Sequence, residues 1–245
     1  MKNFDVKINY LYHSGFSVET KNYFLIFDYY KDEPDNGEKS LENGCIGDKE
    51  LSIDKKIIVF SSHIHPDHFN PIIMNWRGKR QDIEYVLSND IRRKYRYEGV
   101  HYIKLYEELQ LEGLTIKGYG STDAGRSFMV NADGINIFHA GDLNWWYWWD
   151  DTEEEKKQMA GKFKKEVLKI AEENEKLDIA FFPVDPRLKD NYSLGGEYFI
   201  EKTKPEIFIP MHLWDDYNTT NRFKEKISNT DTEIITFDKR GERLL

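Results

Sequence analysis

The sequence predicts an α/β fold in a single domain, and three observations support this expectation. The chain has 245 residues, which is enough to bury a sizeable core and suits one large domain over residues 1–245. Its first half contains short apolar runs rich in β-branched and aromatic residues, which are typical of strands. In its second half, such runs alternate with helix-like stretches.

The first half is predicted to be rich in strands. Three short apolar runs carry this prediction, at residues 4–12, 24–27 and 57–60. Between the second and third runs lie residues 31–51, which are polar and contain one proline and three glycines. We expect a long loop there, acting as a flap over a site, because loops of this length are more often functional than idle.

The second half is predicted to alternate strands and helices. The predicted strands are apolar runs at residues 111–117, 126–131, 135–139, 178–184 and 206–211. Asp133-Gly134 is expected to join the second and third of them as a tight hairpin. Residues 152–176 are charged, with apolar side chains three or four positions apart, which predicts an amphipathic helix. A second helix is expected at residues 193–203.

Composition and charge exclude several classes of protein. The formal net charge of −9 and the pI near 5.4 give no general positive field for binding nucleic acid or acidic membranes. The single cysteine, Cys45, cannot form an intramolecular disulfide, which favours a reducing, cytoplasmic location. The chain begins without a signal-peptide pattern, and no apolar run approaches the ~20 residues that cross a bilayer. The expected partner is a small-molecule substrate, without nucleic acid or membrane; a homo-oligomer is left open.

One segment concentrates side chains that bind metals. It follows the apolar run at residues 57–60 and contains four candidate ligands within six positions, namely His63, His65, Asp67 and His68. Imidazole nitrogen and carboxylate oxygen suit zinc, manganese and iron, and a cluster without thiolates indicates a catalytic rather than a structural site. The alternative is a surface turn with histidines by chance, but this density far exceeds what seven histidines in the chain would give.

These four residues match the pattern H-x-H-x-D-H completely, and the sequence therefore resembles the metallo-β-lactamase superfamily. The resemblance implies a four-layer αββα sandwich and a site for two metal ions. It also implies that His63 and His65 bind the first ion, and that Asp67 and His68 bind the second.

Two later motifs resemble the same family, in the same order along the chain. Asp142, in the segment 138–142, matches an aspartate that bridges the two ions, and His212, after Ile209-Pro210-Met211, matches the histidine that completes the second site. His139 precedes the first of these motifs within a predicted strand. We interpret His139 as a buried structural histidine.

One family position is missing. The third histidine of the first metal site would fall at Thr122 in this sequence. Our hypothesis is that Asp123 supplies the ligand, because a carboxylate oxygen can replace an imidazole on such metals. The alternative is a plain turn in which Asp123 caps its own backbone, and both interpretations stay open.

Four further features lie near these motifs. Asp28 follows a predicted strand and matches an aspartate that supports the metal loop in similar proteins, with a solvent-facing strand end as the alternative. His13 lies in a turn that subgroups of the superfamily also have near their site, and we do not expect it to be a ligand. The aromatic run at residues 145–149 is expected either to line a pocket or interface, or to start a helix. Arg187 is a weak candidate for contacting an anionic substrate.

The predicted activity is hydrolysis with two divalent ions, zinc first, with manganese or iron as alternatives. A hydroxide held between the ions would be the nucleophile, oriented by Asp67 and Asp142 as ligands. The resemblance implies a small ester, lactone, amide or phosphodiester as substrate, and a sugar lactone ranks first by a small margin. The competing hypotheses are a metal-binding sensor or partner-binding module without catalysis, and a redox protein with iron.

Overall fold

The computed structural model describes residues 4–174 and 176–245. They form two compact units: residues 104–237 make the second unit, and the rest of the described chain makes the first. Each unit contains one mixed β-sheet, so the predicted α/β fold is confirmed. The expectation of one domain over residues 1–245 stays a prediction, and residues 1–3 and 175 lie outside the described chain.

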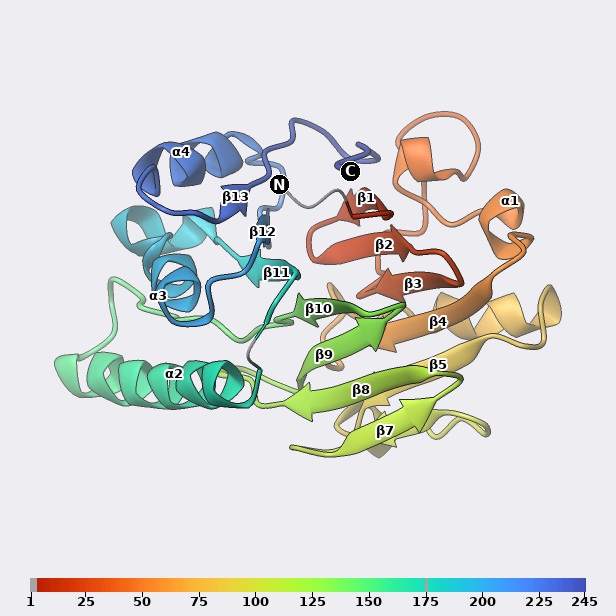
Figure 1. Cartoon of the computed structure of the whole chain (residues 1–245), viewed down its shortest axis with the longest axis horizontal. Helices are drawn as coiled ribbons and strands as arrows, with labels where there is room; N and C mark the ends of the chain where they lie inside the picture. Colours follow the sequence, from red (N-terminus) through yellow and green to blue (C-terminus); the bar gives the residue numbers. More distant parts are fainter. Residues whose placement is uncertain (1–3, 175) are drawn as a thin grey trace. The chain divides into compact units, whose positions relative to one another are not determined.

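The first unit contains a six-stranded sheet (Figure 1). In spatial order its strands are β1 (Lys7–Tyr12), β2 (Gly15–Glu19), β3 (Tyr23–Phe27), β4 (Lys56–Ser61), β5 (Glu84–Ser88) and β6 (His101–Ile103). A short helix, α1 (Asp48–Leu51), and three 3-10 turns connect them; these turns are η1 (Leu41–Asn43), η2 (Pro71–Gly78) and η3 (Ile91–Arg93). β3 and β4 consist almost entirely of buried residues, as expected for inner strands covered on both faces.

Strand direction brings several loops of the first unit to one edge of its sheet. β1 and β3 are both antiparallel to β2, and β3, β4, β5 and β6 are parallel to one another. The carboxyl ends of β1, β3, β4 and β5 therefore lie at the same edge. The residues that follow these ends are His13, Asp28, the segment 62–68 and Asp90.

The last residues of the chain complete the first unit. Backbone hydrogen bonds join Tyr10 to Glu242 and to Gly241, at 3.0 and 2.9 Å, so the carboxyl-terminal segment lies against β1. The Arg240 side chain is buried and donates hydrogen bonds to the loop at residues 31–51. This loop is largely irregular, as predicted, although α1 occupies its end.

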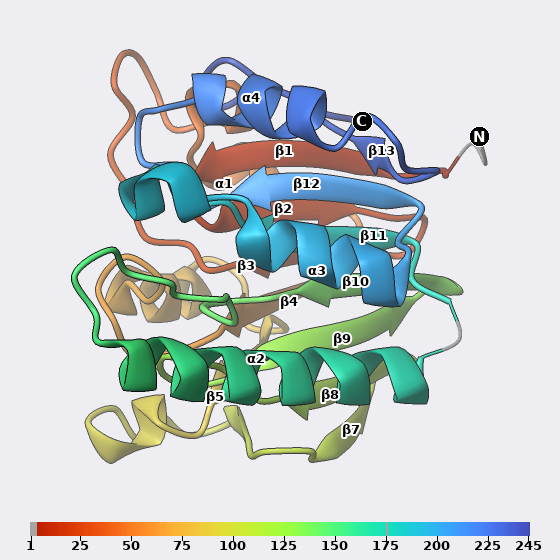
Figure 2. The same cartoon turned by 90° about the vertical axis from the view of Figure 1, so that its left-hand side faces the viewer.

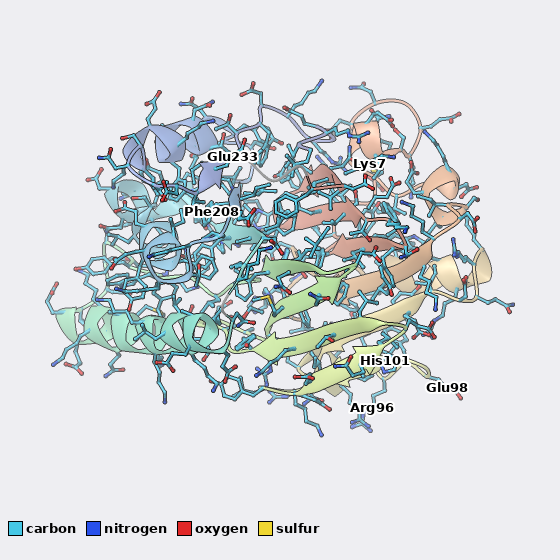
Figure 3. All side chains as sticks on the ribbon, viewed as in Figure 1. Lys7, Arg96, Glu98, His101, Phe208 and Glu233 are labelled. Atoms are coloured by element: carbon cyan, nitrogen blue, oxygen red, sulfur yellow. The ribbon has the colours of Figure 1, made fainter. Side chains whose placement is uncertain are left out.

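The second unit contains a seven-stranded sheet with helices on it. Its strands, in spatial order, are β13 (Glu233–Ile234), β12 (Ile207–Met211), β11 (Ile179–Pro183), β10 (Ile135–His139), β9 (Ser127–Ala132), β8 (Leu114–Tyr119) and β7 (Glu108–Leu111). Its helices are α2 (Glu153–Glu173), α3 (Leu194–Thr203), α4 (Asn218–Lys226) and the 3-10 segment η4 (Pro186–Asn191). Figure 2 shows α2 and α3 side by side across this sheet. The core between helix and sheet is aromatic: Phe182 stacks on Phe199 at 4.5 Å, and Phe208, labelled in Figure 3, packs against both rings.

The second unit also collects strand ends at one edge of its sheet. β10, β11 and β12 are parallel, whereas β9 is antiparallel to both β8 and β10. β8 therefore runs in the same direction as β10, and the carboxyl ends of these four strands share an edge. The residues that follow them are the segment 120–125, Asp142, Asp185 and His212.

Most predicted elements are present, with one misplaced strand. The strand at residues 135–139 and the helix within residues 152–176 are confirmed as β10 and α2. The strand predicted at 111–117 is wrong in its bounds, because Glu112-Gly113 is a turn between β7 and β8 and both residues have positive φ. Among the described residues, no helix is both long and apolar enough to cross a membrane.

Candidate functional site

Asp28 anchors the metal-binding segment of the first unit. Its two carboxylate oxygens accept hydrogen bonds from the backbone N–H and the hydroxyl of Ser62, at 2.7 and 2.6 Å. The Nδ1 atom of His68 lies 2.7 Å from the same carboxylate. An ionised carboxylate only accepts hydrogen bonds, so Nδ1 carries the proton and Nε2 keeps its lone pair for a metal ion. Asp28 thus contacts the segment at Ser62 and His68, and its support of a metal site stays a prediction.

The histidines of this segment lie close together. The His63 ring is 4.1 Å from the His68 ring and 4.6 Å from the His65 ring, measured between centroids. A ligand atom of His63 lies within 4.8 Å of one of His65. The segment also has a fixed backbone, because Asp90 accepts the N–H of Ile64 at 3.0 Å. The four residues of the sequence motif are thus brought together at one edge of the sheet.

Asp67 lies between two imidazoles. Its Oδ2 atom is 3.8 Å from Nε2 of His68 and 3.5 Å from Nε2 of His13. Burial alone would raise the pKa of Asp67, but these two imidazoles lower it below its usual range. Asp67 is therefore ionised at neutral pH and available as a ligand.

In the second unit, Asp142 and His212 form a second donor group. The Oδ1 atom of Asp142 lies 3.3 Å from Nε2 of His212, whose backbone has a positive φ of 66°. The Nδ1 atom of His212 lies 2.8 Å from Asp185, which also accepts the backbone N–H of Arg187 at 2.8 Å. Burial raises the pKa of Asp185, but hydrogen bonds from His212 and Arg187 lower it to about 2. Asp185 therefore holds the Nδ1 atom of His212, as Asp28 holds the Nδ1 atom of His68.

Thr122, at the position of the missing histidine, is part of a turn. Its hydroxyl donates to the carbonyl of Asn144 at 2.6 Å and accepts the N–H of Asn144 at 2.9 Å. These bonds tie the segment 120–125 to the turn that contains Asp142. A carboxylate oxygen of Asp123 lies within 4.8 Å of one of Asp142. This separation allows the carboxylates of Asp123 and Asp142 to contact one ion. The hypothesis that Asp123 is a ligand stays a prediction.

The aromatic run at residues 145–149 forms no helix. Trp145 packs against aromatic side chains of α2 and α3. Trp146 lies against the ring of His212 at 5.4 Å and stacks on Trp148 at 5.9 Å. The guanidinium of Arg187 lies 5.6 Å from the Trp148 ring. Trp145 thus packs against the helices, whereas Trp146 and Trp148 lie near His212.

His139 is part of the core rather than of the donor groups. It lies on β10, is buried, and its Nδ1 atom accepts the N–H of Gly141 at 3.2 Å. Within the described residues, no group of candidate metal ligands includes it. This agrees with its interpretation as a structural histidine.

Two pairs of donor atoms have separations that suit a shared divalent ion. Imidazole and carboxylate ligands bind zinc at about 2.0–2.2 Å, so adjacent ligand atoms of a tetrahedral ion lie roughly 3.4 Å apart. The separations of 3.3 Å between Asp142 and His212 and 3.8 Å between Asp67 and His68 are close to this value. All donors are nitrogen or oxygen, which suits zinc, manganese or iron.

Comparison with known proteins supports this interpretation. No family model matches the sequence. Over 230 residues the chain is 25% identical to a UPF0173 metal-dependent hydrolase of Pyrococcus furiosus, which covers 87% of this chain and 85% of the relative. The solved structure of Igni18, a metallo hydrolase from Ignicoccus hospitalis, matches with a TM-score of 0.64 and 18% identity over 98% of this chain and 97% of the other. YhfI from Bacillus subtilis, described as a metallo-beta-lactamase fold protein, matches with a TM-score of 0.61 and 13% identity, over 97% and 98%. The chain has the metallo-β-lactamase fold.

Within this metallo-β-lactamase fold, two aspartates that contact the candidate metal-binding residues were not predicted from the sequence. Asp185 holds His212, and Asp90 holds the backbone of the H-x-H-x-D-H segment at Ile64. Both follow a strand, β11 and β5 respectively, as Asp28 follows β3. Asp185 directly follows the predicted strand at residues 178–184, which is a local signal for a strand-end carboxylate, but the pairing of the strands decides which histidine it contacts.

Proposed function

We propose that this chain is a metal-dependent hydrolase with two divalent ions, zinc first. The proposed ligands are His63, His65, Asp67 and His68 of the first unit, together with Asp142, His212 and Asp123 of the second. The observation that carries the proposal is the presence of imidazole and carboxylate pairs 3.3–3.8 Å apart at the carboxyl ends of strands. It is also supported by the relative in Pyrococcus furiosus, which is named a metal-dependent hydrolase.

The residues of the chain have separable roles in this proposal. When bound, the two cations lower the pKa of water from about 15.7 towards about 7 and polarise the bond under attack. Asp67 and Asp142 contribute negative charge and accept hydrogen bonds, which orients the attacking water. Asp28 and Asp185 hold the Nδ1 atoms of the neighbouring histidines, so that the rings present Nε2 in one orientation.

For the substrate, we propose a small ester, lactone, amide or phosphodiester, with a sugar lactone first. The partly exposed Trp148 stacks on the buried Trp146, which lies beside His212, and the flat apolar face of Trp148 suits the apolar side of a sugar ring. Fold alone does not choose among these bonds, so the ranking depends on a substrate panel.

The test begins with metal content. Protein purified without added metal or chelator is analysed by elemental mass spectrometry and then assayed on lactones, esters, amides and phosphodiesters. We expect close to two ions per chain and turnover that His212→Ala lowers by more than a hundredfold. His101→Ala is the matched control, because His101 lies on the edge strand β6 beside Glu84. One ion or none would contradict the two-ion proposal, and two ions without turnover would favour a non-catalytic metal-binding protein.

A further inference from the structure

The turn between β1 and β2 has an unusual composition and conformation. Its two residues are His13 and Ser14, since Tyr12 pairs with Gly15 across the hairpin. His13 has a positive φ of 57°, at the turn position where glycine is the usual residue. It is also buried, although hairpin turns usually face water. A buried histidine in the left-handed region persists where its surroundings determine it, and such positions cluster at functional sites.

The surroundings of His13 fix the direction of its ring. The hydroxyl of Tyr10 accepts the backbone N–H of His13 at 2.6 Å. The ring of Tyr30 meets the imidazole edge to face at 6.5 Å, and the ring of His68 meets it at 5.7 Å and 76°. The imidazole thus points along the sheet edge towards the metal-binding segment.

The separation between His13 and Asp67 suits two ligands of one ion. Their Nε2 and Oδ2 atoms lie 3.5 Å apart. A charge-assisted hydrogen bond between nitrogen and oxygen measures about 2.7–2.9 Å, and the bond between His68 and Asp28 in the same unit is 2.7 Å. Adjacent ligands of a tetrahedral zinc ion lie roughly 3.4 Å apart. The distance therefore matches an edge of a coordination polyhedron better than a direct hydrogen bond.

We propose that His13 is a further ligand of the ion bound by Asp67 and His68. One ligand atom from each of these three residues lies within 4.8 Å of the other two. Two imidazoles and one carboxylate form a complete protein ligand set for catalytic zinc or non-haem iron, with open positions for water. The first unit alone then holds one ion. This inference rests on the proposed function for the presence of the ion, and it revises the expectation that His13 is not a ligand.

Through-bond coupling to cadmium tests the assignment directly. Protein with ¹⁵N-labelled histidines is loaded with ¹¹³Cd²⁺ alone, and one-bond coupling between cadmium and a ring nitrogen marks each coordinating histidine. The chain has seven histidines. We expect coupling at His13 in addition to the four proposed histidine ligands. The internal controls are His139 and His101, the latter labelled at the edge of the sheet in Figure 3, and neither should couple.

The outcomes separate this inference from the proposed function. Coupling at the four motif and carboxyl-terminal histidines without His13 would overturn the inference and leave the metal proposal in place. Absence of coupling at every histidine would overturn both.

A variant gives a second readout. His13→Asn keeps a residue that tolerates positive φ, and the hydrogen bond to Tyr10 comes from the backbone, so the turn is retained. We expect the affinity for the more weakly bound Cd²⁺ to fall at least about tenfold, measured by chelator competition. His101→Asn is the matched control and should leave the affinity unchanged. An affinity within threefold of wild type in His13→Asn would contradict a ligand role.

Discussion

Replacing Arg240 tests how the carboxyl-terminal segment holds the first unit together. Its guanidinium is buried and donates four hydrogen bonds to backbone carbonyls. They reach Leu11 at 2.9 Å, Glu33 at 2.7 Å, Lys31 at 2.7 Å and Gly44 at 3.0 Å. Arg240→Met keeps most of the apolar stem and removes all four donors.

The expected loss can be worked from these contacts. A hydrogen bond to a charged group contributes about 1.5–3 kcal/mol, so four independent bonds would contribute roughly 6–12 kcal/mol. Water can reach the loop carbonyls once the loop loosens, and single substitutions above about 4–5 kcal/mol are exceptional. We therefore expect Arg240→Met to lower the free energy of unfolding by about 3–5 kcal/mol. Arg240→Lys, with a single ammonium group, should lose about half as much.

Two measurements check this prediction. Urea denaturation gives the free energy of unfolding, and hydrogen exchange gives the protection of the amides in residues 31–51. Arg243→Met is the matched control, because Arg243 lies in the same segment but is exposed. A loss below about 1 kcal/mol in Arg240→Met, together with unchanged exchange in residues 31–51, would refute the reasoning that Arg240 organises this loop.

Three further predictions concern carboxylates. Asp123→Ala should lower the metal content from two ions per chain to one, by elemental mass spectrometry; unchanged content would favour the plain turn. Asp185→Asn should weaken metal binding about 10–100-fold in a chelator competition, because the adjacent histidine loses its charged acceptor; a change below threefold would speak against this role. The hydrogen bond from Lys117, with that of a second lysine, lowers the pKa of Glu173 to about 2 from its ordinary 4.5. The resulting stabilisation is complete above pH 4.5 and is lost as the pH falls towards 2. Glu173→Gln should therefore cost roughly 0.5–1 kcal/mol at pH 7, after allowance for solvent screening, and nothing near pH 2. Glu172→Gln, on the same helix turn, is the control in pH-dependent denaturation, and equal losses in both variants would contradict the assignment.

The candidate ligands that could be predicted from the sequence are those that lie in one short motif or keep the order of a family pattern. The H-x-H-x-D-H segment is contiguous, so His63 and His68 could be identified without a fold. Asp142 and His212 lie far along the chain, and their order within a family pattern pointed to them. The contact of Asp185 with His212 and the proposed ligand role of His13 were not predicted, because both depend on the directions of the strands and on the edge that their ends share. That information is absent from local spacing.

The same limit explains two of the errors in the predicted strands. β13 (Glu233–Ile234) has two residues, too few to show any periodicity, and it exists through parallel pairing with β12. The strand predicted at 111–117 spans a turn at Glu112-Gly113, because the apolar residues on both sides of the turn form one run in the sequence. Tertiary pairing, and not local propensity, decides such short elements.

In each of the two sheets, an aspartate at the end of a strand holds the Nδ1 atom of a candidate metal-binding histidine. His68 follows β4 and contacts Asp28, which follows β3. His212 follows β12 and contacts Asp185, which follows β11. In each case the two strands are parallel neighbours, so their carboxyl ends lie side by side and the carboxylate meets Nδ1 at 2.7 or 2.8 Å. Because each ring is held in the tautomer that exposes Nε2 before any ion arrives, binding does not have to reorient it. Parallel pairing of these strands therefore places the carboxylate beside the histidine in each candidate metal-binding group.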